Sequence, residues 1–140
     1  AMLETGTPRI AEAIGWGAAV EWLDRHDMKE IHLHINRIAS WTAEQISEID
    51  GITVYGDPTR GDSSGAVSFL HESIQSQDLA LLLDEGGFAV RTGHHCAQPL
   101  MDALGVPSTN RASFWLYNTM DEAEAFVEHL RYVVDRFSDK

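Results

Sequence analysis

Apolar residues recur along the chain at spacings that alternate between helical and extended periods. Spacing and start signals predict helices over residues 8–23, 27–49, 77–85, 99–104 and 119–137. Short alternating or continuous apolar runs predict strands over residues 52–55, 66–70, 88–90 and 111–117. The first two strands are expected to form an antiparallel hairpin. Because the connections are short, the order predicts an α/β (α+β) fold, with helices packed on a mixed or antiparallel sheet of about four strands.

The first predicted helix is apolar on nearly all sides. Thr7 is expected to cap it, with Pro8 as its first residue. Apolar side chains then follow on opposite sides as far as Val20. A helix of this kind needs cover on more than one side, which indicates a partner surface outside this chain.

The other helices show one apolar stripe each. His32 and His34 are expected to be surface or partly buried residues of the second helix rather than ligands, and Trp41 is expected to pack rather than to bind a ligand. In the last helix, Thr119 and Glu122 have the spacing of a capping box. The side chains expected to face the core are Leu79, Leu82, Leu83, Ala123, Phe126, Val127, Leu130, Val133, Val134 and Phe137.

Composition narrows the class of protein. The chain has 140 residues, enough for one domain with a real core, and 44% of them are hydrophobic. Twenty-two acidic residues against ten basic ones give a net charge of −12, which argues against nucleic acid as a partner. No apolar run approaches the length of a membrane span, no secretory signal opens the chain, and a single cysteine allows no internal disulfide. These features predict a cytoplasmic protein.

Candidate chemistry is concentrated in residues 91–99, which read RTGHHCAQP. The stretch contains the only cysteine, Cys96, with His94 and His95 before it and Arg91 at its start. Cys96 is expected on a loop between a strand end and a helix N-terminus. Helix N-terminal amides favour negative charge and lower the pKa of a thiol, and a neighbouring histidine can move a proton. The pattern predicts a nucleophile.

Two other interpretations of Cys96 stay open at this point. A single cysteine in a soluble protein is commonly a small buried apolar residue. A metal site is the second alternative, but adjacent His-His-Cys side chains converge poorly on one ion, and no second ligand pair accompanies them. No metal ligands are therefore assigned.

The motif RTGHHCAQP, followed by Arg-Ala-Ser at residues 111–113 and Tyr-Asn-Thr at 117–119, resembles the C-terminal domain of SUF-type cysteine desulfurases. This subgroup includes selenocysteine lyases and belongs to the class V aminotransferase group of pyridoxal-phosphate enzymes. Residues 6–19 also resemble the segment that leads out of the large domain in that family. The resemblance covers residues 5–137. It implies that residues 5–140 are the small C-terminal domain of a fold-type I enzyme, and that residues 1–4 are a cloning remnant or the end of a preceding large domain.

The resemblance also implies a reaction for the parent enzyme. The Cys96 thiolate takes the sulfur of L-cysteine as a persulfide, L-alanine is released, and the sulfur passes to a SUF-type acceptor protein for iron–sulfur cluster assembly. Arg111 matches the arginine that binds the substrate carboxylate, a task suited to a guanidinium fork. On the residues alone, Arg111 could equally form a surface ion pair.

Other site residues follow from the same resemblance. Arg91, His94 and His95 match family residues near the substrate and the cysteine, and the roles of the two histidines stay open. Gly6 and Thr7 match the segment that reaches the cofactor phosphate of the other subunit in a homodimer, although plain helix capping would also explain them.

The cofactor lysine of the family has no counterpart here. The two lysines of the chain are Lys29 and Lys140, and neither follows a motif that would cradle pyridoxal phosphate. The chain alone is therefore expected to be an inactive domain fragment. Two alternatives differ in function: a standalone sulfur-carrier or interaction module that receives a persulfide on Cys96, and a domain of a selenocysteine lyase.

Overall fold

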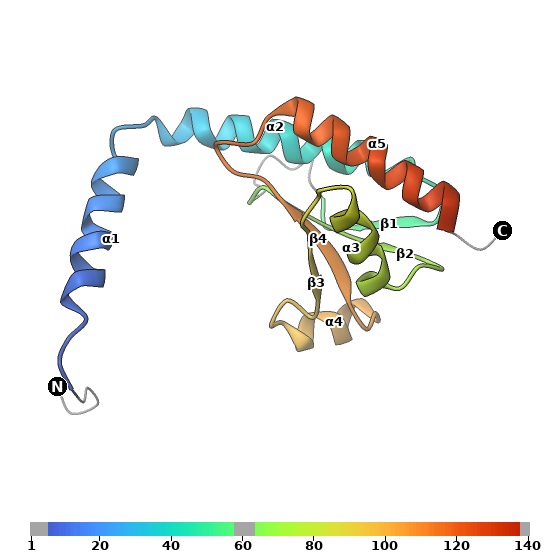
Figure 1. Ribbon diagram of the computed structural model, residues 1–140, viewed down its shortest axis with the longest axis horizontal. Coiled ribbons are helices and arrows are strands. Elements are labelled where there is room, and N and C mark those ends of the chain that lie inside the picture. Colours follow the sequence, from blue (N-terminus) through green and yellow to red (C-terminus); the bar gives the residue numbers. More distant parts are fainter. Residues whose placement is uncertain (1–5, 58–63, 138–140) are drawn as a thin grey trace. The chain divides into compact units, whose positions relative to one another are not determined.

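Nine helices and strands follow one another along the part of the chain, residues 6–57 and 64–137, that the computed structural model describes (Figure 1). They are α1 (Ile10–Leu23), α2 (Met28–Ser47), β1 (Ile52–Tyr55), β2 (Ala66–His71), α3 (Ser76–Glu85), β3 (Arg91–Gly93), α4 (Gln98–Leu104), β4 (Thr109–Ser113) and α5 (Met120–Phe137). This order confirms the predicted one. Residues 1–4 and Lys140 lie outside the described residues.

The chain divides into two compact units, one ending at His32 and the other beginning at Leu33. The first unit contains α1, and none of the residues of α1 is buried. Trp16, for example, is 76% exposed. The predicted start of this helix is wrong, because the helix begins at Ile10 with Arg9 as its N-cap.

The reason for the later start lies in the backbone hydrogen bonds. The amide of Ile10 donates to the carbonyl of Pro8 at 2.9 Å, which makes a tight turn rather than a helical turn. The first bond of helical spacing runs from Ala13 to the carbonyl of Arg9, at 3.1 Å. Thr7 is therefore too early in the chain to cap the helix.

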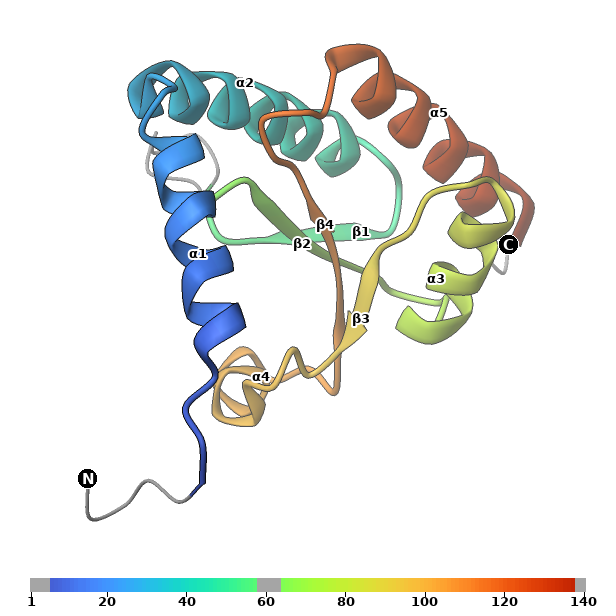
Figure 2. The same ribbon diagram turned by 60° about the vertical axis from the view of Figure 1, so that its left-hand side comes forward.

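The second unit is built on a four-stranded sheet with the order β1-β2-β4-β3. Every neighbouring pair is antiparallel, including the predicted hairpin of β1 and β2. In Figure 2 the four strands are seen with α2 and α5 on one side and α4 away from both. The α/β fold with a sheet of four strands is thus confirmed, with antiparallel pairing throughout.

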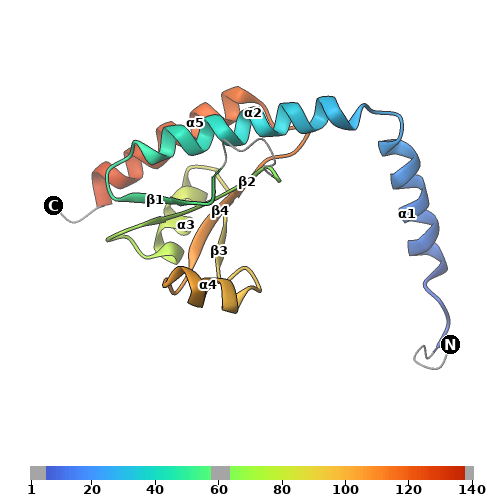
Figure 3. The same ribbon diagram turned by 180° about the vertical axis from the view of Figure 1, so that it is seen from behind.

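Helices α2, α3 and α5 cover one face of this sheet. Figure 3 shows α2 and α5 together from behind, and the Arg131 guanidinium of α5 donates to the carbonyl of Gln45 in α2 at 3.0 Å. The core between helices and sheet includes Ile46, Phe69, Leu79, Leu83, Leu130 and Val133. Among the described residues, no helix is both long and apolar enough to cross a membrane.

Most predicted core residues of the helices are confirmed. Leu79 and Leu83 are fully buried, Leu82 and Trp41 pack against the core edge, and the α5 stripe is buried from Ala123 to Val134. His32 and His34 are exposed. Phe137 is the exception, since it is 47% exposed at the last position of α5.

The capping box at the start of α5 is also confirmed. The amide of Thr119 donates to Glu122 Oε2 at 2.8 Å, and the amide of Glu122 donates to Thr119 Oγ1 at 3.2 Å. Two amides that the helix leaves free are therefore satisfied by side chains.

Two strands differ from their predicted positions. β3 is found at Arg91–Gly93 instead of residues 88–90, and β4 ends at Ser113 instead of residue 117. The apolar side chain of Phe88 packs on Phe126 of α5, but the backbone of Phe88 is not part of the pairing between β3 and β4. The apolar residues of this region are therefore a sign of packing against a helix. The strand pairing with β4 begins only at Arg91. As a result, Arg91 lies on a strand rather than on the loop.

Candidate functional site

Cys96 lies in the turn that joins β3 to α4, as predicted, and its side chain is exposed. The alternative of a small buried apolar residue is therefore wrong. Pro99 lies in the first turn of α4, as predicted. A sulfur in this position is accessible to a second molecule.

The backbone of this turn is unusual at two consecutive residues. His95 has φ of 57° and Cys96 has φ of 61°, and the amide of Ala97 donates to the carbonyl of His94 at 2.8 Å. Positive φ at both central residues is the arrangement of a type I′ turn, which normally favours Gly or Asn. Position 96 holds a cysteine rather than a glycine, although the left-handed backbone conformation costs a residue with a side chain about 1 kcal/mol or more. Strain of this kind is found at functional sites.

Arg91 holds the sulfur from the neighbouring strand. Its Nη2 lies 3.2 Å from Cys96 Sγ and donates a hydrogen bond to it. Because a guanidinium group can only donate, the contact orients the sulfur as an acceptor. The side chain of Cys96 is therefore positioned by β3 as well as by its own turn.

His95 ties the turn to β4. Its Nε2 lies 2.8 Å from Thr109 Oγ1 and 3.1 Å from the Thr109 carbonyl oxygen. Since a carbonyl can only accept, Nε2 carries the proton and Nδ1 is left with a lone pair. Nδ1 is buried and has no partner among the described residues. Burial, followed by the nearby positive charge of Arg111, lowers the pKa of His95.

Arg111 lies on β4 with its Cα directly opposite that of Arg91 on β3. Its Nε donates to Ser113 Oγ at 3.2 Å. The ion pairs found among residues 6–57 and 64–137 are Arg9–Glu12 and Arg131–Glu48, so the alternative of a surface ion pair for Arg111 finds no support there. Like charges placed opposite each other on paired strands repel. An anion bound between them would relieve that repulsion.

A pocket of about 490 Å³ opens beside Arg111, and its described lining comes from β1, β2, β4, α4 and the turn that holds His95. Its polar lining includes His95, Thr109 and Arg111, and its apolar side comes from α4. The α4 residues that line it are Leu100, Met101 and Leu104. The pocket can therefore hold a small molecule that presents an anionic group to Arg111.

Five of the predicted site residues lie together in the second unit, and the other two belong to the first unit. Arg91, His95, Cys96 and Arg111 are linked by the contacts above, and the exposed His94 supplies the carbonyl that closes the turn. Gly6 and Thr7 belong to the first unit and are exposed, and their role in cofactor binding stays a prediction.

Sequence reasoning missed Thr109, the buried residue that anchors His95. It lies 14 positions further along the chain, in a stretch that had been expected to be a loop. Only the pairing of Gly93 with Thr109 across β3 and β4 brings the two segments together. No local pattern would have revealed it.

The residues near Cys96 do not fit a cofactor that is held through a lysine. Lys29 is exposed at the start of α2 in the first unit, where its amide bonds to Asp27. No lysine is among the described residues that line the pocket beside Arg111. Within the described part of the chain, no group of three or more His, Cys, Asp or Glu side chains could hold a metal ion.

Comparison with known families defines the class of protein. The pattern of the family described as "Aminotransferase class-V" matches residues 1–126. The chain belongs to this family.

Curated relatives narrow the class further. The chain is 45% identical, over 96% of its length, to a probable cysteine desulfurase of Halalkalibacterium halodurans. It is 42% identical, over 89% of its length, to a cysteine desulfurase of Haloferax volcanii. It covers 32% of the first relative and 29% of the second, so it spans about a third of their length.

Solved structures agree with these relatives. The cysteine desulfurase CsdA of Escherichia coli superposes with a TM-score of 0.88 at 32% identity. A cysteine desulfurase of Thermococcus onnurineus superposes with a TM-score of 0.89 at 34% identity. In each case the match covers 96% of this chain and 33% of the other. The fold is thus one portion of the fold of those enzymes.

Proposed function

We propose that the chain is the small-domain part of a SUF-type cysteine desulfurase, in which Cys96 takes the sulfur of L-cysteine as a persulfide. The observation that carries the proposal is an exposed cysteine on a strained turn, held by Arg91. Arg91 and Arg111 lie opposite each other nearby, and neither forms an ion pair with another described residue. The similarity to cysteine desulfurases supports it.

In the proposed reaction the Cys96 thiolate attacks the sulfur of L-cysteine. A bond forms between the two sulfur atoms and the substrate C–S bond breaks. The electron pair of that bond stays with the β-carbon, which takes up a proton, so L-alanine is the second product. The pyridoxal phosphate of the parent would be held by the part of the enzyme that carries a suitable lysine, because the residues described here do not provide one.

Two arginines have separate tasks in this proposal. Arg111 binds the carboxylate of L-cysteine, for which its position beside the pocket and its lack of a described ion pair are suitable. Arg91 orients Cys96 Sγ through its hydrogen bond. His95 keeps the turn in place through Thr109.

The parent is proposed to be a cytoplasmic homodimer whose Gly6 and Thr7 reach the cofactor phosphate of the partner. Residues 5–140 would form the small domain, and the acceptor of the sulfur would be a SUF-type protein of iron–sulfur cluster assembly. Helix α1 is apolar and none of its residues is buried, which supports the proposal that a further part of the parent covers it.

The test is a chimera in which this chain replaces the matching third of the H. halodurans relative. Sulfide release from L-cysteine is measured with and without Cys96→Ser, which is expected to abolish it. Arg111→Ala is expected to raise KM roughly 10- to 100-fold, since hydrogen bonds to charged groups contribute about 1.5–3 kcal/mol. Arg136→Ala, an exposed arginine of α5, is the control. Full activity of the Cys96→Ser chimera would contradict the proposal.

A standalone sulfur carrier is a second candidate, favoured by the exposure of Cys96. Here the chain alone is mixed with a complete cysteine desulfurase and L-cysteine, and the mass of Cys96 is measured. A gain of one sulfur atom supports a carrier. Normal alkylation of Cys96 without any sulfur uptake would reject it. Repeating the chimera assay with L-selenocysteine tests the selenocysteine lyase alternative.

A further inference from the structure

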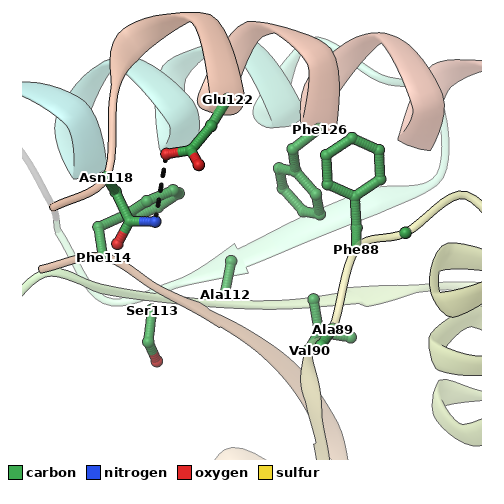
Figure 4. Close-up of a pocket in the computed structure, with 10 residues that line it drawn as sticks. Phe88, Ala89, Val90, Ala112, Ser113, Phe114, Asn118, Glu122 and Phe126 are labelled. Atoms are coloured by element: carbon green, nitrogen blue, oxygen red, sulfur yellow. Dashed lines mark hydrogen bonds between the residues drawn. The ribbon is translucent and has the colours of Figure 1, made fainter.

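A second pocket, of about 240 Å³, lies on the side of the sheet that α5 covers (Figure 4). Ala112 of β4 lines it, whereas Arg111 lines the pocket beside Cys96. Because successive residues of a strand point to opposite faces, the side chains of Arg111 and Ala112 lie on opposite sides of the sheet. Ser113 also lines the second pocket, and its side chain points away from α5 in Figure 4. The two pockets have no lining residue in common among the described residues.

One wall of this second pocket carries a fixed carboxylate. Glu122 Oε2 accepts from the amide of Thr119 at 2.8 Å and from Asn118 Nδ2 at 3.4 Å. These bonds lower the pKa of Glu122, the bond from the Thr119 amide most of all. Glu122 takes no part in the ion pairs found among the described residues. The wall of the pocket therefore carries a carboxylate that has no ion-pair partner among the described residues.

Three aromatic rings line the same pocket. Phe88 and Phe126 meet edge to face with their ring centroids 5.8 Å apart, and Phe114 lies nearer to Asn118 and Glu122 (Figure 4). The faces of aromatic rings attract cations. Rings together with a carboxylate favour a flat cation with an apolar stem, which describes arginine better than lysine.

The backbone around the pocket indicates how such a side chain is presented. β4 pairs with β3 only from Thr109 to Arg111, while Ala112 and Ser113 pair with β2 alone. Residues 87–90 line the pocket where β3 has not yet begun. Among the described residues, the side of β4 that faces away from β2 has no strand partner at Ala112 and Ser113, which suits an extended peptide. The volume suits one side chain, since pockets for drug-sized ligands begin at about 300 Å³.

We propose that this pocket binds an arginine side chain from an extended segment in the remaining part of the parent enzyme. A single arginine gives only weak affinity between separate molecules, but tethering in one chain provides an effective concentration in the millimolar range. The relatives are about three times as long as this chain, which leaves ample sequence for such a segment. The inference rests on the proposed function, because it requires a longer parent.

The chemistry of the pocket is tested on the 140-residue chain with N-acetyl-arginine methylamide as the probe and the uncharged citrulline analogue as its match. Amide NMR shifts of residues 112–122 are followed during titration. The arginine probe is expected to bind and the citrulline probe to bind at least roughly threefold more weakly. Equal binding of the two probes would overturn the proposal.

Variants locate the binding. Glu122→Gln removes the charge but keeps an acceptor for the Thr119 amide, and it is expected to weaken arginine binding roughly fivefold. Glu124→Gln removes the same charge from an exposed position of α5 that does not line the pocket. Phe114→Leu removes a ring and keeps an apolar side chain. Equal binding by both glutamine variants, together with no effect of Phe114→Leu, would overturn the proposal.

The source of the arginine is tested with the chimera described above. If a segment of the parent fills the pocket, the probe that shifts residues 112–122 in the isolated chain leaves them unshifted in the chimera. Equal binding to both proteins would overturn the assignment to the parent chain. Sulfide release is not part of this readout, so failure of the proposed function and failure of this inference are distinguished.

Discussion

Neighbouring residues of β4 point to opposite faces of the sheet, and the two faces differ in burial and in charge. Ala112 is 6% exposed and packs in the core, opposite Val67 of β2. Arg111 is half-buried, faces Arg91 and has no ion pair within the described residues. One face of the sheet carries the packed core, and the other carries the two arginines and lies next to the strained turn. Stability and candidate chemistry can therefore be changed separately.

The largest expected effect comes from breaking the packed face. Phe69→Ala on β2 removes a fully buried ring that meets Phe126 at a centroid distance of 6.2 Å. We expect the free energy of unfolding to fall by about 3–5 kcal/mol. Urea denaturation followed by circular dichroism measures it.

The control for this change is the next residue of the same strand. Leu70 points to the other face and is only half-buried, so Leu70→Ala is expected to cost clearly less than Phe69→Ala. Equal losses from the two variants would mean that the two faces do not differ as described.

A smaller effect, of opposite sign, is expected at the strained turn. Cys96→Gly places glycine where φ is 61°, and should stabilise the protein by about 0.5–1 kcal/mol. Cys96→Ala keeps a Cβ and is expected to leave stability nearly unchanged. Both variants lose the thiol. Thermal unfolding of the two proteins side by side separates backbone strain from the loss of sulfur, and a Gly variant less stable than the Ala variant would contradict the strain.

The smallest effect concerns pH. Burial and Arg111 lower the pKa of His95 in the folded protein below that of the unfolded chain. As pH falls through about 6.5, the unfolded chain therefore takes up the proton first, and stability is lost towards acid. Stability of the wild type is expected to fall more between neutral and mildly acidic pH than that of His95→Gln.

The exposed neighbour provides the control for the pH experiment. His94→Gln removes a histidine from the same turn and is expected to keep the acid-dependent loss. If His94→Gln removed that loss and His95→Gln kept it, the burial of His95 would not be its cause. Denaturation at several pH values decides between the two.

Much of the fold followed from patterns that are local in the chain. The order of helices and strands, the capping box of Thr119 and Glu122, and the place of Cys96 before a short helix were all predicted correctly. Each of these depends on residues fewer than ten positions apart. Helical periodicity, caps and turns act over that range.

The errors arose where distant segments decide the outcome. The strand predicted at residues 88–90 packs on α5 instead of pairing, and β3 begins at Arg91, where β4 lies opposite. Phe137 fits the periodicity of α5, but it is the last residue of the helix and stays exposed. An apolar residue becomes buried or paired only if another segment is there to cover it.

The sequence alone was sufficient to propose Cys96 as the reactive residue, because the single cysteine and its motif are contiguous in the chain. The register of β3 and β4 places Arg91 opposite Arg111 and brings His95 to Thr109. The packing of α5 forms the pocket that Glu122 lines. These arrangements bring together residues that lie between 14 and 39 positions apart. Only the folded chain brings such residues together. Closing loops of that length costs conformational entropy, which the whole core offsets and no single contact could.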